Sequence, residues 1–172
     1  MIRYVRERND NCSCGPIAII NAMKWSGEAS TLRSHFRRVC QASRCKPSIR
    51  GAPRGHFDRT MHQLCPNINI KKRVFPTIQS IYEHLQKSDS AVVVTISWIE
   101  TGDHVGRMVK SHYALLVRTT ASGKSFVGIN YCRGKTQSLI RRTTLIYHCR
   151  RRRNFLGDWY PVAWFLTKKQ KQ

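Results

Sequence analysis

Acidic residues are scarce in this sequence: 9 Asp and Glu stand against 31 Lys and Arg among 172 residues. The formal net charge is therefore +22 at pH 7. A positive field of this kind attracts polyanions over a range of about 8 Å in physiological salt. The composition predicts contact with nucleic acid, an anionic membrane surface or an acidic partner protein. The alternative is that the excess charge only keeps the protein in solution.

Long hydrophobic runs are also missing. No segment reaches the roughly 20 apolar residues of a membrane-spanning helix, and the opening MIRYVRERNDNC lacks the apolar core of a signal peptide. We therefore expect a soluble cytoplasmic protein, or one of the host cytoplasm or the virion if its source is a virus. The 7 cysteines are odd in number, which argues against a disulfide framework and predicts reduced thiols.

Internal repeats and Pro/Gly/Ser linkers are absent as well, so we expect a single domain over residues 1–172. The first half reads as helical, with an irregular segment over 41–73, and the second half reads as strands. Helices are predicted over 14–25, 31–39 and 77–87, and strands over 91–98, 112–118, 125–130, 138–148 and 160–169. This order predicts an α+β fold in which a buried N-terminal helix packs on a C-terminal antiparallel sheet.

Cys14 is the first candidate for chemistry. It opens CGPIAIINAMKW, an almost wholly apolar helix with Pro16 in its first turn. The positive end of a helix stabilises a thiolate, and the backbone N–H of Cys14 can point at a developing oxyanion. Gly15 would let a substrate backbone come close. The alternative is that Cys14 is a small buried core residue.

A predicted hairpin supplies the base. If the strands 112–118 and 125–130 pair around a turn centred on residue 121, His112 lies directly opposite Asn130. Cβ atoms of opposed residues lie about 5 Å apart, so the Asn side-chain oxygen can accept a hydrogen bond from one ring N–H and leave the other ring nitrogen as a base. A register slip of one residue would separate the two side chains.

Three segments together resemble a known family. NCSCGPIAIINAMKW, SHYALLV and FVGIN are similar, in this order, to the nucleophile, histidine and following strands of papain-like cysteine peptidases, closest to the double-glycine-leader (bacteriocin-processing) peptidases. The resemblance implies a papain-like fold and hydrolysis of a peptide bond through a thioester. It also implies Cys14 as nucleophile, His112 as base and Asn130 as its orienting residue, with no metal or cofactor.

The sequence departs from that family at several positions. Ser111 stands where Gly is common, and Asn130 where the closest relatives often have Asp. The family's Gln before the nucleophile, an oxyanion donor, is missing here, and Asn9 and Asn11 are the candidate replacements.

Alternatives within the chain stay open. Cys12 is a rival nucleophile and His104 a rival base. A structural zinc site is a further alternative, with ligands drawn from one basic stretch: His35, Cys40, Cys45, His62 and Cys65.

The densest basic zone suggests a second function. Its arginines, with Trp159, Tyr160 and Trp164 nearby, could hold phosphates and stack on bases. These candidate nucleic-acid contacts are Arg141, Arg142, Arg150, Arg151, Arg152 and Arg153. The rival hypotheses to a viral or phage processing protease are therefore a catalytically silent basic nucleic-acid-binding or virion protein on the same scaffold, and a related deamidase or isopeptidase.

Overall fold

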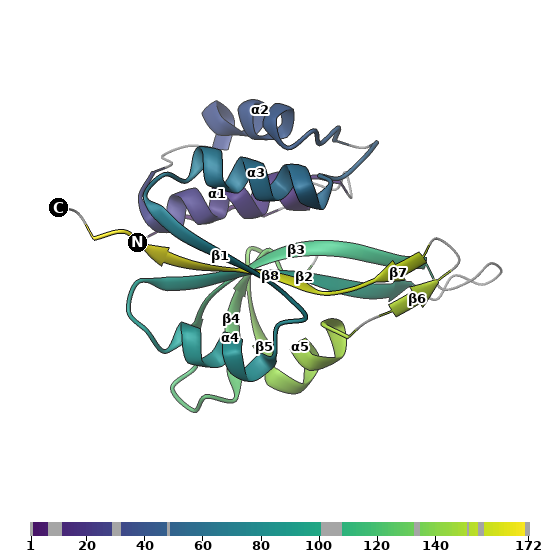
Figure 1. Ribbon diagram of the computed structural model, residues 1–172. Helices are drawn as coiled ribbons and strands as arrows, with labels where there is room; N and C mark the ends of the chain where they lie inside the picture. Colours follow the sequence, from purple (N-terminus) through teal and green to yellow (C-terminus); the bar gives the residue numbers. More distant parts are fainter. Residues whose placement is uncertain are drawn as a thin grey trace.

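The computed structural model describes residues 2–6, 12–28, 32–47, 49–100, 108–132, 135–150, 152–154 and 157–170 (Figure 1). Its helices are α1 (Cys14–Ser26), α2 (Leu32–Ala42), α3 (Arg54–Leu64), α4 (Ile78–Leu85) and α5 (Arg142–His148). Its strands are β1 (Ile68–Val74), β2 (Ser90–Glu100), β3 (Met108–Thr119), β4 (Ser125–Ile129), β5 (Gln137–Arg141), β6 (Arg152–Asn154), β7 (Gly157–Trp159) and β8 (Val162–Lys168).

One large sheet organises the molecule. Its strand order is β1-β8-β2-β3-β4-β5, and every neighbouring pair is antiparallel. Helices α1, α2 and α3 lie on one face and α4 and α5 on the other, while β6 and β7 form a separate ribbon (Figure 1). The expected α+β architecture, with N-terminal helices packed on an antiparallel sheet, is confirmed.

The first helix is the buried one, as the sequence predicts. Nearly all of α1 is inaccessible to solvent, because apolar side chains occur all around it. Pro16 stands in its first turn, where a missing N–H costs little. Gly27 ends the helix in the left-handed region, with φ of 90°, and its N–H bonds to the Lys24 carbonyl.

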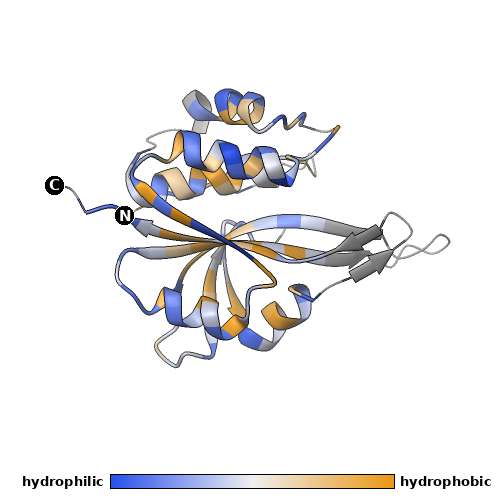
Figure 2. Cartoon of the chain, in the orientation of Figure 1, coloured by the Kyte–Doolittle hydropathy of each residue, from blue (hydrophilic) through white to orange (hydrophobic). Residues whose placement is uncertain are grey.

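The alternating side chains of the sheet create two cores. On β3, Tyr113 and Leu115 belong to the core beneath α1, whereas Ala114 and Leu116 belong to the core beneath α4 and α5. Figure 2 shows the central strands mostly pale to orange and the outer helices α2 and α3 with blue positions. A sheet covered on both faces explains the continuous apolar run of β2.

The segment 41–73 is more regular than expected. It contains α3 and β1, which corrects the prediction of a long irregular stretch. β1 is an edge strand, and four of its seven residues are exposed in a row, including Lys71, Lys72 and Arg73. Basic side chains protect a sheet edge from further pairing, but they also hide the strand pattern from sequence analysis.

The predicted strand over 138–148 is wrong in its second half. β5 ends at Arg141, and residues 142–148 form α5, although Thr143, Thr144 and Ile146 favour strands. Leu145 is the buried side chain that fixes α5 to the sheet. The last predicted strand is present as β8, and its Trp164 and Phe165 are core residues.

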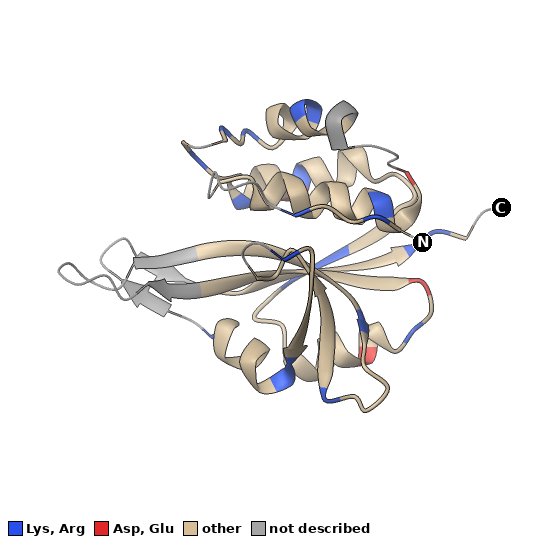
Figure 3. Cartoon of the chain, turned by 180° about the vertical axis from the view of Figure 1, so that it is seen from behind, with Lys and Arg blue, Asp and Glu red and all other residues tan. Residues whose placement is uncertain are grey.

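The surface carries the charge imbalance. Seen from behind, Lys and Arg lie on α2, α3 and the ends of the sheet, and Asp or Glu appears at few places (Figure 3). Within the part of the chain that is described, no helix is both long and apolar enough to cross a membrane.

Candidate active site

The N-terminus of α1 is tightly packed. Cys14 is the first residue of the helix and is only 5% exposed. A Cβ atom added at Gly15 would lie 2.9 Å from the Cβ of Ala52 and 3.7 Å from Cδ2 of Tyr113. Glycine at this position therefore allows the helix end to approach the protein's own chain, a role different from the substrate access that the sequence suggested.

His112 lies on β3 and is buried, with 8% exposure. Its Nε2 is 2.5 Å from the main-chain oxygen of Asn130. A carbonyl oxygen only accepts, so Nε2 carries the proton of the neutral ring and Nδ1 holds the lone pair. The imidazole is thus held in the tautomer that makes Nδ1 the basic atom.

The environment of His112 favours its neutral form. Burial lowers the pKa of the imidazole, and the hydrogen bond to Asn130 raises it to a smaller extent. A neutral ring at neutral pH can accept a proton, which is what a general base must do.

Asn130 has an unusual backbone that explains the bond. Its φ is 54°, in the left-handed region that Asn tolerates better than most residues. Its N–H bonds to Thr136 before β5, while its carbonyl accepts from His112 on β3. In a regular antiparallel strand both groups would face the same neighbour. The left-handed turn therefore redirects the carbonyl toward the histidine.

The predicted hairpin register is wrong. Leu115 pairs with Ile129 and Leu116 with Gly128, and an irregularity then shifts Arg118 to face Val127. Residue 118 therefore does not face 124, and a regular continuation would set Ala114, not His112, opposite Asn130. His112 and Asn130 are still brought together, because the chain turns at Asn130 and its main-chain oxygen reaches the ring.

Tyr113 links the helix end to the histidine strand. Its ring packs near Gly15, and a negative charge on Cys14 would raise its pKa, in addition to the larger effect of burial. The side chain of Tyr113 points from β3 toward α1, and the side chain of the neighbouring His112 points to the opposite face of the sheet. The pairing of β4 with β3 ends at Leu115 and Ile129, three residues after His112 on β3.

Two of the other thiols, Cys65 and Cys149, lie at the C-terminal ends of α3 and α5, where the helix does not stabilise a thiolate. Burial raises the pKa of Cys45, Cys65 and Cys149 to about 12 in each case. The main-chain oxygen of Cys12 accepts a hydrogen bond from the sulfur of Cys45 at 3.3 Å. All seven cysteines are thiols rather than disulfides, as predicted.

Several sequence candidates fall elsewhere. Asn9, Asn11 and His104 lie outside the described residues. Across the described ranges, no three His, Cys, Asp or Glu side chains come together in a way that could hold a metal ion, so the zinc alternative finds no support.

Two of the candidate nucleic-acid contacts lie together on the sheet face opposite α1. Arg141 and Arg142 line a groove of about 930 Å³ between α4, the β3–β4 turn and α5. The Arg142 guanidinium lies over the Tyr82 ring, 4.6 Å from its centroid. Arg150 is exposed, Arg151 lies outside the described residues, and Arg152 and Arg153 contribute backbone to β6.

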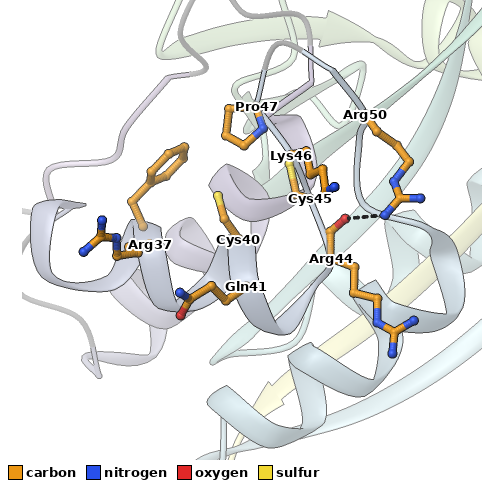
Figure 4. Close-up of a pocket in the computed structure, with 9 residues that line it drawn as sticks. Arg37, Cys40, Gln41, Arg44, Cys45, Lys46, Pro47 and Arg50 are labelled. Carbon is orange, nitrogen blue, oxygen red and sulfur yellow. Dashed lines mark hydrogen bonds between the residues drawn. The ribbon is translucent and has the colours of Figure 1, made fainter.

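A second pocket, which the sequence did not predict, lies beside the start of α1. It has a volume of about 630 Å³ and is formed by α2 and the segment that follows it (Figure 4). The signal for it in the sequence is the basic amphipathic pattern TLRSHFRRV over residues 31–39. Its lining residues include Cys40 and Cys45, with Arg37, Arg44, Lys46 and Arg50.

Comparisons with known proteins place the fold. No family model matches the chain, and no curated protein matches its sequence. Among solved structures, a proposed C39-like peptidase from Bacillus anthracis matches with a TM-score of 0.60 at 8% identity. The match covers 99% of this chain and 96% of that chain. The chain thus has the papain-like fold of a C39-like peptidase over nearly its full length.

Proposed function

We propose that the protein is a cysteine peptidase that hydrolyses a peptide bond, with Cys14 as nucleophile, His112 as base and Asn130 as the residue that positions the base. The observation that carries the proposal is the packing of the α1 N-terminus against β3 next to His112, whose Nε2–H is fixed on Asn130. The fold shared with a C39-like peptidase supports the same reading. A reduced, cytoplasmic environment would suit the thiol chemistry.

The reaction follows from these groups. Nδ1 of His112 takes the proton of the Cys14 thiol, and the thiolate attacks the carbonyl carbon of the scissile amide. The N–H groups of the first helical turn stabilise the oxyanion that forms. The imidazolium then gives its proton to the leaving amine, and a thioester remains on Cys14. Water, deprotonated by His112, hydrolyses the thioester and releases the acid and the thiol.

The same chemistry serves related substrates. A deamidase or an isopeptidase would use the identical steps on a side-chain amide or an isopeptide bond, because a fold does not determine the substrate. The catalytically silent alternative differs in one measurable respect: its Cys14 would have no enhanced reactivity.

The test is selective alkylation. We expect iodoacetamide at pH 6 to modify Cys14 first, because Cys45, Cys65 and Cys149 stay protonated far above that pH. His112→Ala should slow the modification of Cys14, and removing a general base should lower peptide hydrolysis by about 10²–10⁴-fold. Peptide mapping by mass spectrometry identifies the modified thiol in each variant.

The matched control is His84→Ala. His84 lies on α4 and is half-buried, its Nε2 lies 2.8 Å from the main-chain oxygen of Leu166, and its ring packs edge-on against Phe165. This variant should leave the alkylation of Cys14 unchanged. Slow and uniform labelling of all seven cysteines in the wild type would instead favour the silent scaffold.

A second candidate function rests on the groove beside α5. It presents cations together with hydroxyl groups, the combination that contacts phosphate oxygens. Its charged and hydroxyl-bearing residues are Lys124, Arg141, Arg142, Ser122, Ser125 and Thr143. We propose that this groove binds nucleic acid. A Lys124→Glu/Arg141→Glu variant should reduce the salt-dependent retention of the protein on single-stranded DNA.

A further inference from the structure

The pocket beside the start of α1 combines an apolar floor with a basic rim. Figure 4 shows the sulfur atoms of Cys40 and Cys45 between Arg37 on one side and Arg50 on the other. Phe36 and Pro47 complete the apolar part of the lining. Four of the nine lining residues are Lys or Arg, and none is Asp or Glu. Such a pocket fits a ligand that joins an apolar group to negative charge.

The thiol of Cys45 in the floor is neutral at physiological pH. Burial, and to a smaller extent the interactions with Cys40, raise the pKa of Cys45 to about 12. A protonated thiol behaves as a small apolar group, so Cys45 adds no negative charge to the pocket. Any anion that enters meets the cationic rim alone.

The positive field extends beyond the rim. Arg44, Arg59 and Arg50 each lower the pKa of His56 on α3, after the larger effect of desolvation. Among the described residues, Asp58 is the acidic side chain of α3, and it is already engaged by Lys72 at 3.5 Å and by Trp164 at 2.7 Å. The basic surface is therefore not neutralised by the protein's own carboxylates in this part of the described chain.

The pocket adjoins the proposed nucleophile. The sulfur of Cys45 donates to the Cys12 carbonyl at 3.3 Å, and a Cβ added at Gly51 would lie 3.6 Å from the same oxygen. Cys14 is close enough for its charge to affect the pKa of Cys45. A peptide whose scissile bond reaches Cys14 can therefore extend past Gly51 and Cys45 into the pocket.

We propose that this pocket is a specificity site for an acidic segment of the substrate, in which an apolar side chain enters between Phe36 and Pro47 while neighbouring carboxylates contact Arg37 and Arg44. The proposal rests on the peptidase function proposed above. A peptide suits the site better than nucleic acid, because the floor is apolar and none of the described lining residues carries a hydroxyl group that could contact phosphates. Single-stranded DNA is therefore an alternative outcome of the test.

The experiment measures binding to the full chain carrying Cys14→Ala, so that nothing is cleaved. The probe is a short fluorescent peptide with one leucine flanked by glutamates, and binding is followed by fluorescence anisotropy. We expect Arg37→Glu/Arg44→Glu to weaken binding by about tenfold, since each exposed ion pair contributes up to about fivefold. Replacing the leucine of the probe with alanine should weaken binding by about threefold or more.

The matched control is Lys87→Glu/Lys135→Glu, which changes the net charge equally at exposed positions that line neither this pocket nor the groove beside α5. It should change peptide binding by less than about twofold. Arg37→Lys/Arg44→Lys keeps the charge and should retain binding, and thermal unfolding of each variant checks that the fold is intact. Three results would overturn the proposal. These are an equal loss of peptide binding in both Glu variants, an equal affinity for the leucine and alanine probes, and displacement of the peptide from this pocket by oligothymidylate.

The two proposals fail in different ways. Selective alkylation of Cys14 with no preference for the acidic probe would remove the specificity site and leave the peptidase. Pocket-dependent binding of the acidic probe without an activated Cys14 would remove the peptidase and leave a binding site for acidic peptides.

Discussion

The two reacting groups of the proposed site are held by different kinds of force. Cys14 is held by packing: the helix end that carries it presses on Ala52, Phe57 and Tyr113. His112 is held by a hydrogen bond to a backbone carbonyl, whose direction depends on the left-handed conformation of Asn130. The position of the nucleophile should therefore respond to changes in volume, and the position of the base to changes in backbone conformation.

The largest effect on stability should come from Gly15→Ala. In an ordinary helix this change gains about 0.5–1 kcal/mol. Here the new methyl group would lie 2.9 Å from the Cβ of Ala52, and overpacking of this kind costs about 1–3 kcal/mol. We expect a net loss in the free energy of unfolding, measured with urea, together with slower alkylation of Cys14 because the helix end has moved.

Gly55→Ala provides the matched control for that change. Gly55 lies in α3, and a Cβ atom there meets nothing within 4 Å. Alanine should stabilise the protein by up to about 1 kcal/mol and leave the thiol reactivity as it is. If both alanine variants gained stability, the tight contact at Gly15 would not hold the helix end in place.

The base half of the site should respond to backbone conformation. Asn130→Ala places a residue that disfavours the left-handed region at φ 54° and should cost about 1–2 kcal/mol. Asn130→Gly accepts that conformation and keeps the carbonyl that bonds to His112. We expect the glycine variant to retain stability and most of the alkylation rate of Cys14, since the main-chain oxygen rather than the side chain positions the ring.

Asn130→Asp tests the electrostatic effect of this position on His112 through the pH profile of Cys14 alkylation, which a purely structural role of Asn130 would not change. A carboxylate near the imidazole would raise its pKa, so the pH profile of alkylation should shift upward while the stability at neutral pH stays close to that of wild type. A glycine variant that loses the reactivity of Cys14 and keeps its stability would show instead that the side-chain amide is required.

The sequence predicted those parts of the fold whose local pattern and burial agree. The all-round apolar helix α1 and the continuous run of β2 are buried on every side, so their composition carries the signal. β1 and α5 were missed because context outweighs propensity there: β1 is a basic edge, and α5 is fixed by Leu145 although its threonines favour strands.

The candidate site was predictable as residues but not as geometry. Cys14 stands out by its place at a helix end, and His112 and Asn130 by their places on a hairpin. The irregularity between Leu116 and Arg118 altered the register, and single-residue shifts of this kind leave no clear pattern in a sequence. The basic pocket was not predicted, because the sequence does not show that the segment after α2 folds back beside the helix and encloses a cavity with it.

The smallest expected effect is a dependence of stability on pH. Burial lowers the pKa of His112 below its ordinary value of 6.5, so the unfolded chain binds more protons than the folded one as pH falls below that value. The free energy of unfolding should therefore rise with pH up to about 6.5 and then become independent of this group. His112→Gln keeps an N–H donor for the Asn130 carbonyl but cannot titrate, so it should flatten the slope.

Burial also lowers the pKa of His84, and His84→Gln should remove a separate part of the same slope. Urea titrations of both variants between about pH 5 and 7 separate the two contributions. An unchanged slope in His112→Gln would mean that the ring is not held neutral by burial, and the hydrogen bond to Asn130 would then be the main influence on the proposed base.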